Sequence, residues 1–466
     1  MDFEGLLKEY WGHDQFRPLQ REVIEAVQRG ESALVLMPTG SGKSLCYQLP
    51  SLFLEDLVLV ISPLIALMKD QVDEARKKGL QATFINSSLS KQAREKAYQD
   101  LASGKIKLLY VTPERFRKSD FREALQKRKV SLLAVDEAHC ISEWGHDFRP
   151  DYTRLKEIRD FLGNPVTLAL TATATQGVRK DILKQLSLLE STTIFCTGFE
   201  RPNLELSIEH VVGLEDKVRH FIGLHHQHPG AKIVYFALVD TLKKFSFELE
   251  KLSIPHLIYH GQLNNDVRRR NQNLFQKEGD PVILATPAFG LGVNKSNIRM
   301  VIHGEVPGSI ESYYQEVGRA GRDGLPAYAS LLYDPDDVSI QMDFIKWAHP
   351  DPAFIRKVYY LIKDNSGPVQ QQGYEYLRQQ MHFYHSRDFR VETVVKLLDR
   401  WGVLENFHNY RQWQIIDELP EDLLDEESFA NHLKVQQHKL LQMLQLAKSD
   451  GDIKSQVVGY FEVSQS

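Results

Sequence analysis

Cysteine and long apolar runs are both scarce in this chain. Its 466 residues contain three cysteines, Cys46, Cys140 and Cys196, with no CxxC pair and no paired-histidine spacing. A disulfide framework and a cysteine-based zinc site are therefore not expected. No apolar run approaches the ~20 residues of a membrane span, and the N-terminal segment has no signal-peptide pattern. We expect a reduced, cytosolic protein without a membrane segment.

An excess of basic residues is also lacking, since the formal net charge is −5 and the sequence pI is about 6.4. A strongly basic balance would have favoured a nucleic-acid partner. Binding needs only a local basic stripe, however, so the overall charge does not exclude such a partner. The run RRR at 268–270 is a candidate for that stripe. The length of the chain predicts two to four domains.

Short apolar runs alternate with amphipathic stretches through most of the chain. Runs of this length are typical of buried parallel strands. Their alternation with helical patterns predicts doubly wound α/β layers. The first set of predicted strands is SALVLMP (32–38), LVLVIS (57–62), IKLLYVT (106–112), SLLAVDE (131–137) and VTLALTAT (166–173), and the second is KIVYFALV (232–239), PHLIYH (255–260), PVILAT (281–286), RMVIHGE (299–305) and ASLLYDP (329–335).

The pattern becomes mainly helical after Asp343. Helical stretches there precede a short predicted hairpin with Phe407, His408, Asn409 and Tyr410 at its tip. Helices followed by a hairpin are compatible with a winged-helix domain, and a small stabilising helical domain is an equal alternative. The expected segments are two α/β domains (1–198 and 199–345), a winged-helix-like domain (346–416), and an acidic linker with a helical tail (417–466).

MPTGSGKS (37–44) lies between a predicted strand and an apolar helical stretch, which is the setting of a phosphate-binding loop. Its glycines let backbone N–H groups face phosphates, and the helix adds a favourable dipole. Lys43 would reach the β- and γ-phosphates, and Ser44 would ligate Mg²⁺. Met37 stands where the usual pattern has glycine, and a glycine-rich turn is the alternative. The predicted nucleotide-binding residues of this loop are Thr39, Gly40, Ser41, Gly42, Lys43 and Ser44.

DEAH (136–139) ends another predicted strand. Asp136 would hold Mg²⁺, and Glu137 would polarise the attacking water. An acidic pair at a strand end is unremarkable by itself. Together with the upstream lysine it predicts a site that binds ATP and Mg²⁺ and hydrolyses ATP.

Several further motifs follow one another in a fixed order. They are VISPLIALMKDQ (60–71), LLYVTPER (108–115), DEAHCISEWGHDFRPDY (136–152), ALTATAT (169–175), GFERPNL (198–204), ATPAFGLGVNK (285–295) and YYQEVGRAGRDG (313–324). In this order the chain resembles the RecQ family of superfamily-two DNA helicases, over at least residues 3–335. The resemblance implies two RecA-like motor domains that bind ATP and Mg²⁺.

The resemblance also implies residues of the nucleotide site outside the phosphate loop. FRPLQ (16–20) matches the adenine-recognition motif of the family, so Arg17 and Gln20 would contact the base or nearby phosphates. The family often has an aromatic residue where this chain has His13. Whether the His13 imidazole stacks on the adenine in the same way is an open question at this point. Across the domain interface, Gln315 would face the nucleotide, Arg319 would enter the cleft, and Arg322 would act as the arginine finger.

DNA-binding residues are implied in the same way. Trp144, Phe148 and Arg149 match the aromatic-rich loop with which the family senses single-stranded DNA, and aromatic faces stack on any base. Burial of the two rings in a core is the alternative. Thr171 and Thr173 would link this loop to the DEAH carboxylates. The predicted contacts with the DNA backbone are Ser62, Arg115 and Thr286.

The chain departs from the family pattern in two places. Leu238 and Val239 stand where a Ser-Arg pair is common. At 452–466, Ile453 or a neighbour stands where relatives begin a set of four zinc-binding cysteines. Either the metal has been lost or the sequence is truncated here, and we expect a short form of the family without a zinc site in these residues.

The resemblance predicts an ATP-dependent DNA helicase that tracks single-stranded DNA 3′ to 5′ and acts on forked DNA in recombination or repair. We expect a monomer in the bacterial cytosol, associated with the nucleoid. A DNA-stimulated translocase or annealing factor with weak unwinding is one alternative, and an RNA-remodelling ATPase is another. The loop WGHDFRPDY (144–152) favours DNA over RNA.

Overall fold

The structure is a computed structural model, and it describes residues 1–63, 65–86, 89–142, 150–277, 279–290, 295–382, 388–407, 409–421 and 424–462. The chain forms two compact units. The first comprises Met1–Asp334 and Gln445–Ser466, and the second comprises Pro335–Leu444.

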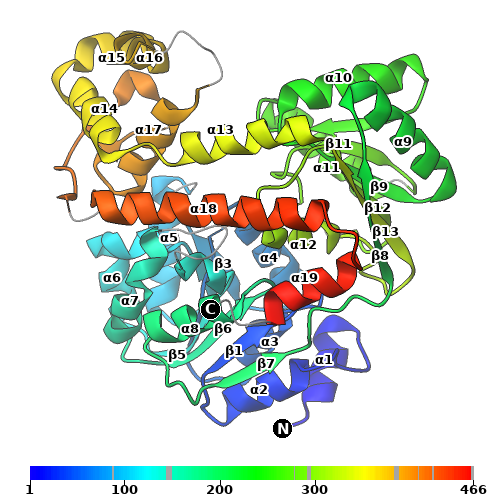
Figure 1. The fold of residues 1–466 in the computed structure, drawn as a ribbon. Coiled ribbons are helices and arrows are strands. Elements are labelled where there is room, and N and C mark those ends of the chain that lie inside the picture. Colours follow the sequence, from blue (N-terminus) through cyan, green and yellow to red (C-terminus); the bar gives the residue numbers. More distant parts are fainter. Residues whose placement is uncertain are drawn as a thin grey trace. The chain divides into compact units, whose positions relative to one another are not determined.

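The first unit contains two parallel sheets, and the earlier one is drawn in blue to teal in Figure 1. Among the described residues it has seven strands in the order β3-β4-β2-β5-β6-β1-β7, and every neighbouring pair is parallel. Parallel neighbours need crossover connections, which are usually helical. The strands are β1 (Ala33–Leu36), β2 (Leu57–Ile61), β3 (Ala82–Ile85), β4 (Leu108–Val111), β5 (Val130–Val135), β6 (Val166–Thr171) and β7 (Thr193–Cys196).

Side chains of these strands alternate between two apolar cores. In β1, Leu34 and Leu36 belong to one core, whereas Ala33 and Val35 belong to the other. This alternation follows from the two-residue period of a strand. Burial of a Leu or Val side chain contributes about 1.5–3 kcal/mol, so both faces need a helical cover. The helices of this part are α1 (Phe3–Trp11), α2 (Gln20–Gln28), α3 (Leu45–Gln48), α4 (Ile65–Lys77), α5 (Lys91–Ala102), α6 (Ser119–Gln126), α7 (Leu155–Phe161) and α8 (Gln176–Gln185).

The second sheet has the same parallel design. The part of the chain that the structure describes contributes six strands, in the order β10-β11-β9-β12-β13-β8. Its strands are β8 (Leu204–His210), β9 (Ala231–Tyr235), β10 (Leu257–Tyr259), β11 (Val282–Ala285), β12 (Ile298–His303) and β13 (Ala327–Tyr333). Its helices are α9 (Gly213–Gln227), α10 (Val239–Lys251), α11 (Asn265–Lys277) and α12 (Ile310–Val317). We call the parts built on the two sheets the first and second lobes.

A short helix near the end of the chain, α19 (Ile453–Glu462), contacts both lobes. The Phe461 ring stacks on Phe199, in the segment that joins the sheets, with ring centroids 4.6 Å apart. On the first lobe, the Gln176 side chain donates to the Glu462 carbonyl at 2.7 Å, and Arg179 donates to the Phe461 carbonyl at 2.9 Å. The last carbonyls of a helix have no partner within it, and side chains of α8 satisfy two of them here.

The second unit is mainly helical. Its apolar core includes Trp401 and Trp413, and the Asp351 side chain caps a helix by accepting from the Phe354 N–H. Its elements are α13 (Val338–Ala348), α14 (Pro352–Asp364), α15 (Ser366–Gln372), α16 (Tyr374–Gln380), α17 (Arg390–Arg400), the antiparallel pair β14 (Leu404–Glu405) and β15 (Gln414–Ile415), and α18 (Glu426–Ala447), the last of which runs past its boundary. Of the helices that the structure describes, none has the length and apolar character to cross a membrane.

The predicted α/β fold class and the helical C-terminal region are confirmed. Each predicted strand of both lobes coincides with an observed strand, and the predicted hairpin is β14–β15. The domain boundaries and the winged-helix assignment stay predictions. At the predicted hairpin tip, Phe407 and Tyr410 pack against the apolar core of the second unit. His408 lies outside the described residues.

Candidate functional site

The phosphate loop lies directly after β1, at the carboxyl end of the first sheet. Gly40 and Gly42 both have φ of 84°, a conformation that glycine adopts at little cost. Lys43 Nζ donates to the carbonyl of Met37 at 3.0 Å. The helix that follows, α3, has only four residues and continues as a 3-10 turn at Leu49–Leu52. Pro50 has no N–H for the next helical hydrogen bond, so the expected helix dipole at this loop is short.

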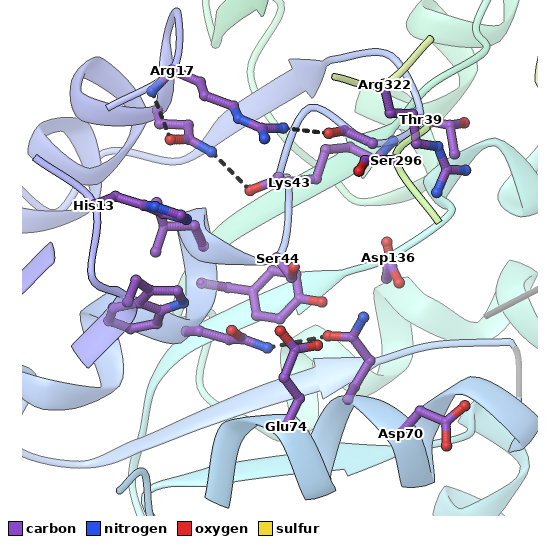
Figure 2. A pocket seen from close by; sticks show the side chains of 18 of the residues that line it. His13, Arg17, Thr39, Lys43, Ser44, Asp70, Glu74, Asp136, Ser296 and Arg322 are labelled. Carbon is purple, nitrogen blue, oxygen red and sulfur yellow. Dashed lines mark hydrogen bonds between the residues drawn. The ribbon is translucent and has the colours of Figure 1, made fainter. Parts of the chain in front are cut away.

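Residues of FRPLQ brace this loop from the side. The backbone N–H of Arg17 donates to the Gln20 side chain at 2.9 Å, and the Gln20 amide donates to the carbonyls of Ser41 and Gly42 at 3.1 Å each. Arg17 also donates to the Gly40 carbonyl. Figure 2 shows His13 at the same end of the cleft. His13 is exposed and lines the cleft together with Trp11, so an aromatic ring is present there besides the imidazole.

The DEAH carboxylates lie at the end of β5. The pKa of Asp136 is raised to about 7, chiefly by burial and also by the adjacent Glu137, against the lowering effect of Lys43. Burial also lowers the pKa of Lys43. Two neighbouring carboxylates and one desolvated lysine are charges that a nucleotide phosphate with a divalent cation would compensate. The donor set therefore fits ATP with Mg²⁺, with Ser44 and Asp136 facing the same space.

One cleft of about 700 Å³ collects residues of both lobes. From the second lobe, Gln315, Arg319 and Arg322 line it opposite Lys43 and Asp136. The Arg322 side chain lies so close to the phosphate loop that a Cβ on Gly40 would be 2.6 Å from its Cδ. Burial and Arg319 lower the pKa of Arg322 to about 10, a value at which the guanidinium is still charged at neutral pH.

A chain of polar contacts connects Glu137 to the second lobe. A carboxylate oxygen of Glu137 is 3.4 Å from Nδ1 of His139, and that nitrogen is 2.8 Å from the Thr171 hydroxyl. Thr171 in turn bonds the backbone of Thr173, and the Thr173 hydroxyl accepts from the Gln315 amide at 3.3 Å. The structure thus brings together the predicted link residues and the predicted Gln315, with His139 as a member that the sequence interpretation did not assign.

The predicted DNA-contacting residues differ in their exposure, and three of them are not described by the structure. Trp144, Phe148 and Arg149 lie outside the described residues. Thr286 is half-buried directly after β11. Ser62 is 4% exposed and hydrogen-bonds Asp136, and Arg115 is 8% exposed and donates to the Tyr98 hydroxyl at 2.6 Å. Their contacts with the DNA backbone stay predictions.

Other residues of the cleft were not predicted. Asp70 and Glu74 lie on α4 and point into the cleft, and Ser296 enters it from the second lobe (Figure 2). Burial raises the pKa of Asp70. Asp70 belongs to the motif VISPLIALMKDQ (60–71), which continues as a helix after β2. Its membership of that motif was the signal that could have predicted it. Within the described ranges no group of three or more His, Cys, Asp and Glu side chains is arranged to hold a metal ion.

Comparison with known proteins identifies two helicase modules. Residues 17–181 match the DEAD/DEAH box helicase family, and residues 215–324 match the helicase conserved C-terminal domain. The probable ATP-dependent DNA helicase RecS of Bacillus subtilis is 39% identical over 342 residues, which cover 73% of this chain and 68% of that protein. The ATP-dependent DNA helicase RecQ of Haemophilus influenzae is 43% identical over 333 residues, or 72% of this chain and 53% of the relative. This chain belongs to the RecQ family.

The RecQ of Bacillus subtilis is 41% identical and aligns with 83% of this chain, but with 62% of its own length. The chain thus spans between half and two thirds of the first RecQ relatives. Solved structures of other helicases share the fold of this chain at low sequence identity. One is Dbp5 of S. cerevisiae bound to RNA and ADP BeF3, with a TM-score of 0.57, 17% identity, and coverage of 72% of this chain and 88% of that chain. Another is the helicase MrfA bound to DNA and AMPPNP. It has a TM-score of 0.59 and 20% identity, and the match covers 73% of this chain and 52% of that chain.

Proposed function

We propose that this protein is an ATP- and Mg²⁺-dependent DNA helicase that moves 3′ to 5′ along single-stranded DNA and opens forked duplexes, in recombination or repair. The observation that carries the proposal is the shared cleft, in which Lys43 and the DEAH carboxylates of one lobe face Arg322 of the other. Membership of the RecQ family supports DNA as the substrate, since the relatives are named DNA helicases.

The residues divide the work of hydrolysis between the lobes. Lys43 and Ser44 would hold the phosphates and the cation, and a bound Mg²⁺ would neutralise charge on the phosphates. Glu137 would accept a proton from the attacking water. Arg322 would approach the γ-phosphate only when the lobes close, where its charge stabilises the transition state.

The contacts between Glu137 and Gln315 offer a route for coupling. Because Gln315 bonds Thr173 across the lobes, a change in lobe position alters the environment of His139 and Glu137. A motor needs such a two-state element, biased by nucleotide and by DNA. In this proposal DNA acts on the first lobe through Trp144, Phe148 and Arg149, and through Thr286 on the second.

The test compares ATP hydrolysis with and without single-stranded DNA, alongside unwinding of duplexes that carry a 3′ or a 5′ tail. We expect strong stimulation by DNA and opening of the 3′-tailed duplex alone. Trp144→Ala should keep basal hydrolysis and lose stimulation, and exposed Phe247→Ala is the matched control. Stimulation without unwinding would instead indicate a translocase or annealing factor, and stimulation by structured RNA alone would indicate an RNA remodeller.

A further inference from the structure

The loop that carries Arg319 and Arg322 has little regular structure of its own. It begins where α12 ends and runs to the start of β13, over residues 318–326, and we call it the finger loop. Helix C-termini leave carbonyl groups without helical partners. The last carbonyls of α12 accept from N–H groups of Gly318, Arg319 and Ala320. The partners of the finger loop's own carbonyls therefore decide how firmly its two arginines are placed.

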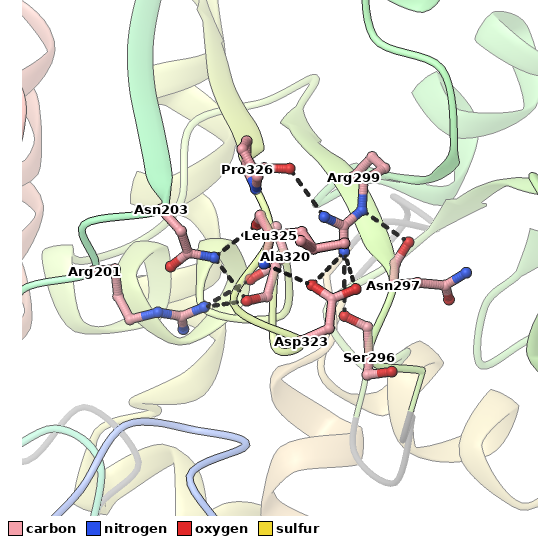
Figure 3. Close-up of polar contacts among 10 residues, drawn as sticks. Arg201, Asn203, Ser296, Asn297, Arg299, Ala320, Asp323, Leu325 and Pro326 are labelled. Atoms are coloured by element: carbon pink, nitrogen blue, oxygen red, sulfur yellow. Dashed lines mark hydrogen bonds and ion pairs between the residues drawn. The ribbon is translucent and has the colours of Figure 1, made fainter.

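Two side chains from the segment that joins the lobes donate to carbonyls of the finger loop (Figure 3). The Arg201 guanidinium donates to the carbonyls of Gly318 (3.3 Å), Ala320 (2.9 Å) and Gly321 (3.1 Å). The Asn203 amide donates to the carbonyls of Gly321 and Leu325, at 2.8 Å each. The carbonyls so held lie before, between and after the two arginines.

The fit around Gly321 is tight. Its φ is 60°, and a Cβ there would lie 2.5 Å from the Asn203 amide nitrogen. The Asn203 carbonyl also accepts from the Ala327 N–H at 2.9 Å, at the first residue of β13. The loop is thus attached at its middle and at its end to the same few residues. Such attachment fixes the backbone and leaves the arginine side chains to point away into the cleft.

A third side chain, that of Arg299, holds the outer end of the finger loop. Arg299, on β12, forms an ion pair with Asp323 at 2.5 Å and donates to the Pro326 carbonyl at 2.9 Å. Arg299 belongs to the second lobe itself, whereas Arg201 and Asn203 belong to the segment between the sheets. That segment also contacts α12, because the Tyr314 hydroxyl donates to the Phe199 carbonyl at 3.0 Å.

We propose that Arg201 and Asn203 are positioning residues that hold the finger loop in place for ATP hydrolysis. This inference rests on the proposed function, since it assigns a task to the motif GFERPNL within that reaction. Neither side chain lines the cleft, so they act through the finger loop and not on the nucleotide. Since they lie on the connection between the lobes, movement of that connection would shift the arginine finger.

The test uses conservative changes with matched controls. Arg201→Lys keeps the charge but cannot reach three carbonyls, and Asn203→Ala removes the amide. We expect kcat to fall about tenfold to a hundredfold, which is the cost of a misplacement near 1 Å. KM for ATP and affinity for ADP should stay near wild type, while affinity for ADP with aluminium fluoride should fall with kcat, because the finger acts in the transition state.

The controls are residues with the same chemistry elsewhere. Arg159 is half-buried and donates to the carbonyls of Leu186 and Ser187 at 3.3 Å, and the half-buried Asn271 donates to the Ile258 carbonyl at 2.8 Å. Arg159→Lys and Asn271→Ala should lower the melting temperature by similar amounts and leave kcat unchanged. The inference is overturned if the Arg201 and Asn203 variants keep kcat, or if kcat and ADP affinity fall together.

Amide hydrogen exchange separates this inference from the proposed function. Exchange across residues 319–325 should accelerate in Arg201→Lys and Asn203→Ala and not in the two controls, whether or not the protein turns over ATP. Absence of DNA-stimulated hydrolysis in the wild type would sink the proposed function alone. Unchanged exchange in the finger loop would sink the positioning role alone.

Discussion

Lys43 shows how the cleft depends on single charges. Its ammonium group lies near two carboxylates and donates to the Met37 carbonyl, so it is held in place before a nucleotide arrives. Removal of one preorganised charge or donor from a reaction site commonly costs a factor of about 10² to 10³ in rate.

Lys43→Ala should therefore lower DNA-stimulated ATP hydrolysis by about 10² or more. It should also weaken ATP binding, because in the proposed site the lysine would contact the phosphates in the ground state. The matched control is Lys105→Ala, an exposed lysine paired with Asp100, which should hydrolyse ATP at the wild-type rate. Equal loss of activity in both variants would show that the cleft is not where ATP is hydrolysed.

Asp136 gives a pH dependence with a definite sign. An unfolded aspartate has a pKa near 3.9, and burial raises that of folded Asp136 to about 7. The folded state therefore binds more protons between these values, and stability falls as pH rises from about 4 to 7. Asp136→Asn, which carries no charge, should raise the melting temperature of nucleotide-free protein more at pH 8 than at pH 5.

The measurement is thermal unfolding in a chelator, with exposed Asp450→Asn as the control. A gain in melting temperature that is the same at both pH values would contradict the assignment. With nucleotide present, Mg²⁺ competes with the proton on Asp136, so the affinity for Mg²⁺ should rise over the same interval.

Residue chemistry was predictable where a short motif carries it. Lys43 and Asp136 were predicted from local motifs and Arg322 from the family resemblance, and all three line one cleft. Ser62 is buried beside Asp136, and its motif alone does not tell which face of the strand end it occupies. Trp11 and Asp70 were missed because each reaches the cleft from a helix whose packing the sequence does not specify.

At the scale of elements, the central strands and the edge strand β10 were predicted, whereas the edge strands β3, β7 and β8 were not. β3 and β7 have four residues each, and β7 lies at the sheet edge with a largely exposed surface. β8, also an edge strand, alternates polar and apolar residues as LELSIEH. Continuous apolar runs identify strands covered on both faces, so strands covered on one face escape that criterion. Pro50 predicts that α3 is short, because proline lacks the N–H that a longer helix would need.

Helix α19 makes a testable contribution to stability. Phe461 is fully buried and contacts Phe199 and Tyr314, at 4.6 and 5.0 Å between ring centroids. Phe461→Ala should cost about 3–5 kcal/mol of unfolding free energy, as buried Phe-to-Ala changes do. Phe461→Leu should cost less because most of the volume is kept. Exposed Leu441→Ala should change stability by less than about 0.5 kcal/mol.

Denaturant unfolding of the three variants checks this ranking. A cost for Phe461→Ala no greater than that for Leu441→Ala would show that α19 does not hold its place against the lobes. Because Phe461 packs on the segment that also bears Arg201, the same variant should raise exchange in the finger loop, though less than Arg201→Lys does.

At the scale of the first unit, the site exists only because two lobes meet. Neither lobe holds a complete set of groups, since Lys43 and Asp136 come from one and Arg322 from the other. In the proposed function, closure around ATP would assemble the site and hydrolysis would favour its opening. A ligand shifts such an equilibrium by the difference in its affinities for the two states.

Arg322→Ala tests whether the second lobe supplies charge to the transition state. Hydrolysis should fall by about 10³ or more, the usual worth of an arginine finger, while ATP binding is largely kept because Lys43 and the phosphate loop are intact. Arg219→Ala removes an exposed arginine of the same lobe, paired with Asp216, and should behave as wild type. If Arg322→Ala loses ATP affinity and kcat in equal measure, its charge serves binding of the nucleotide and not the transition state. In that case the second lobe would act as a cover over the cleft, and coupling would have to run through Gln315 alone.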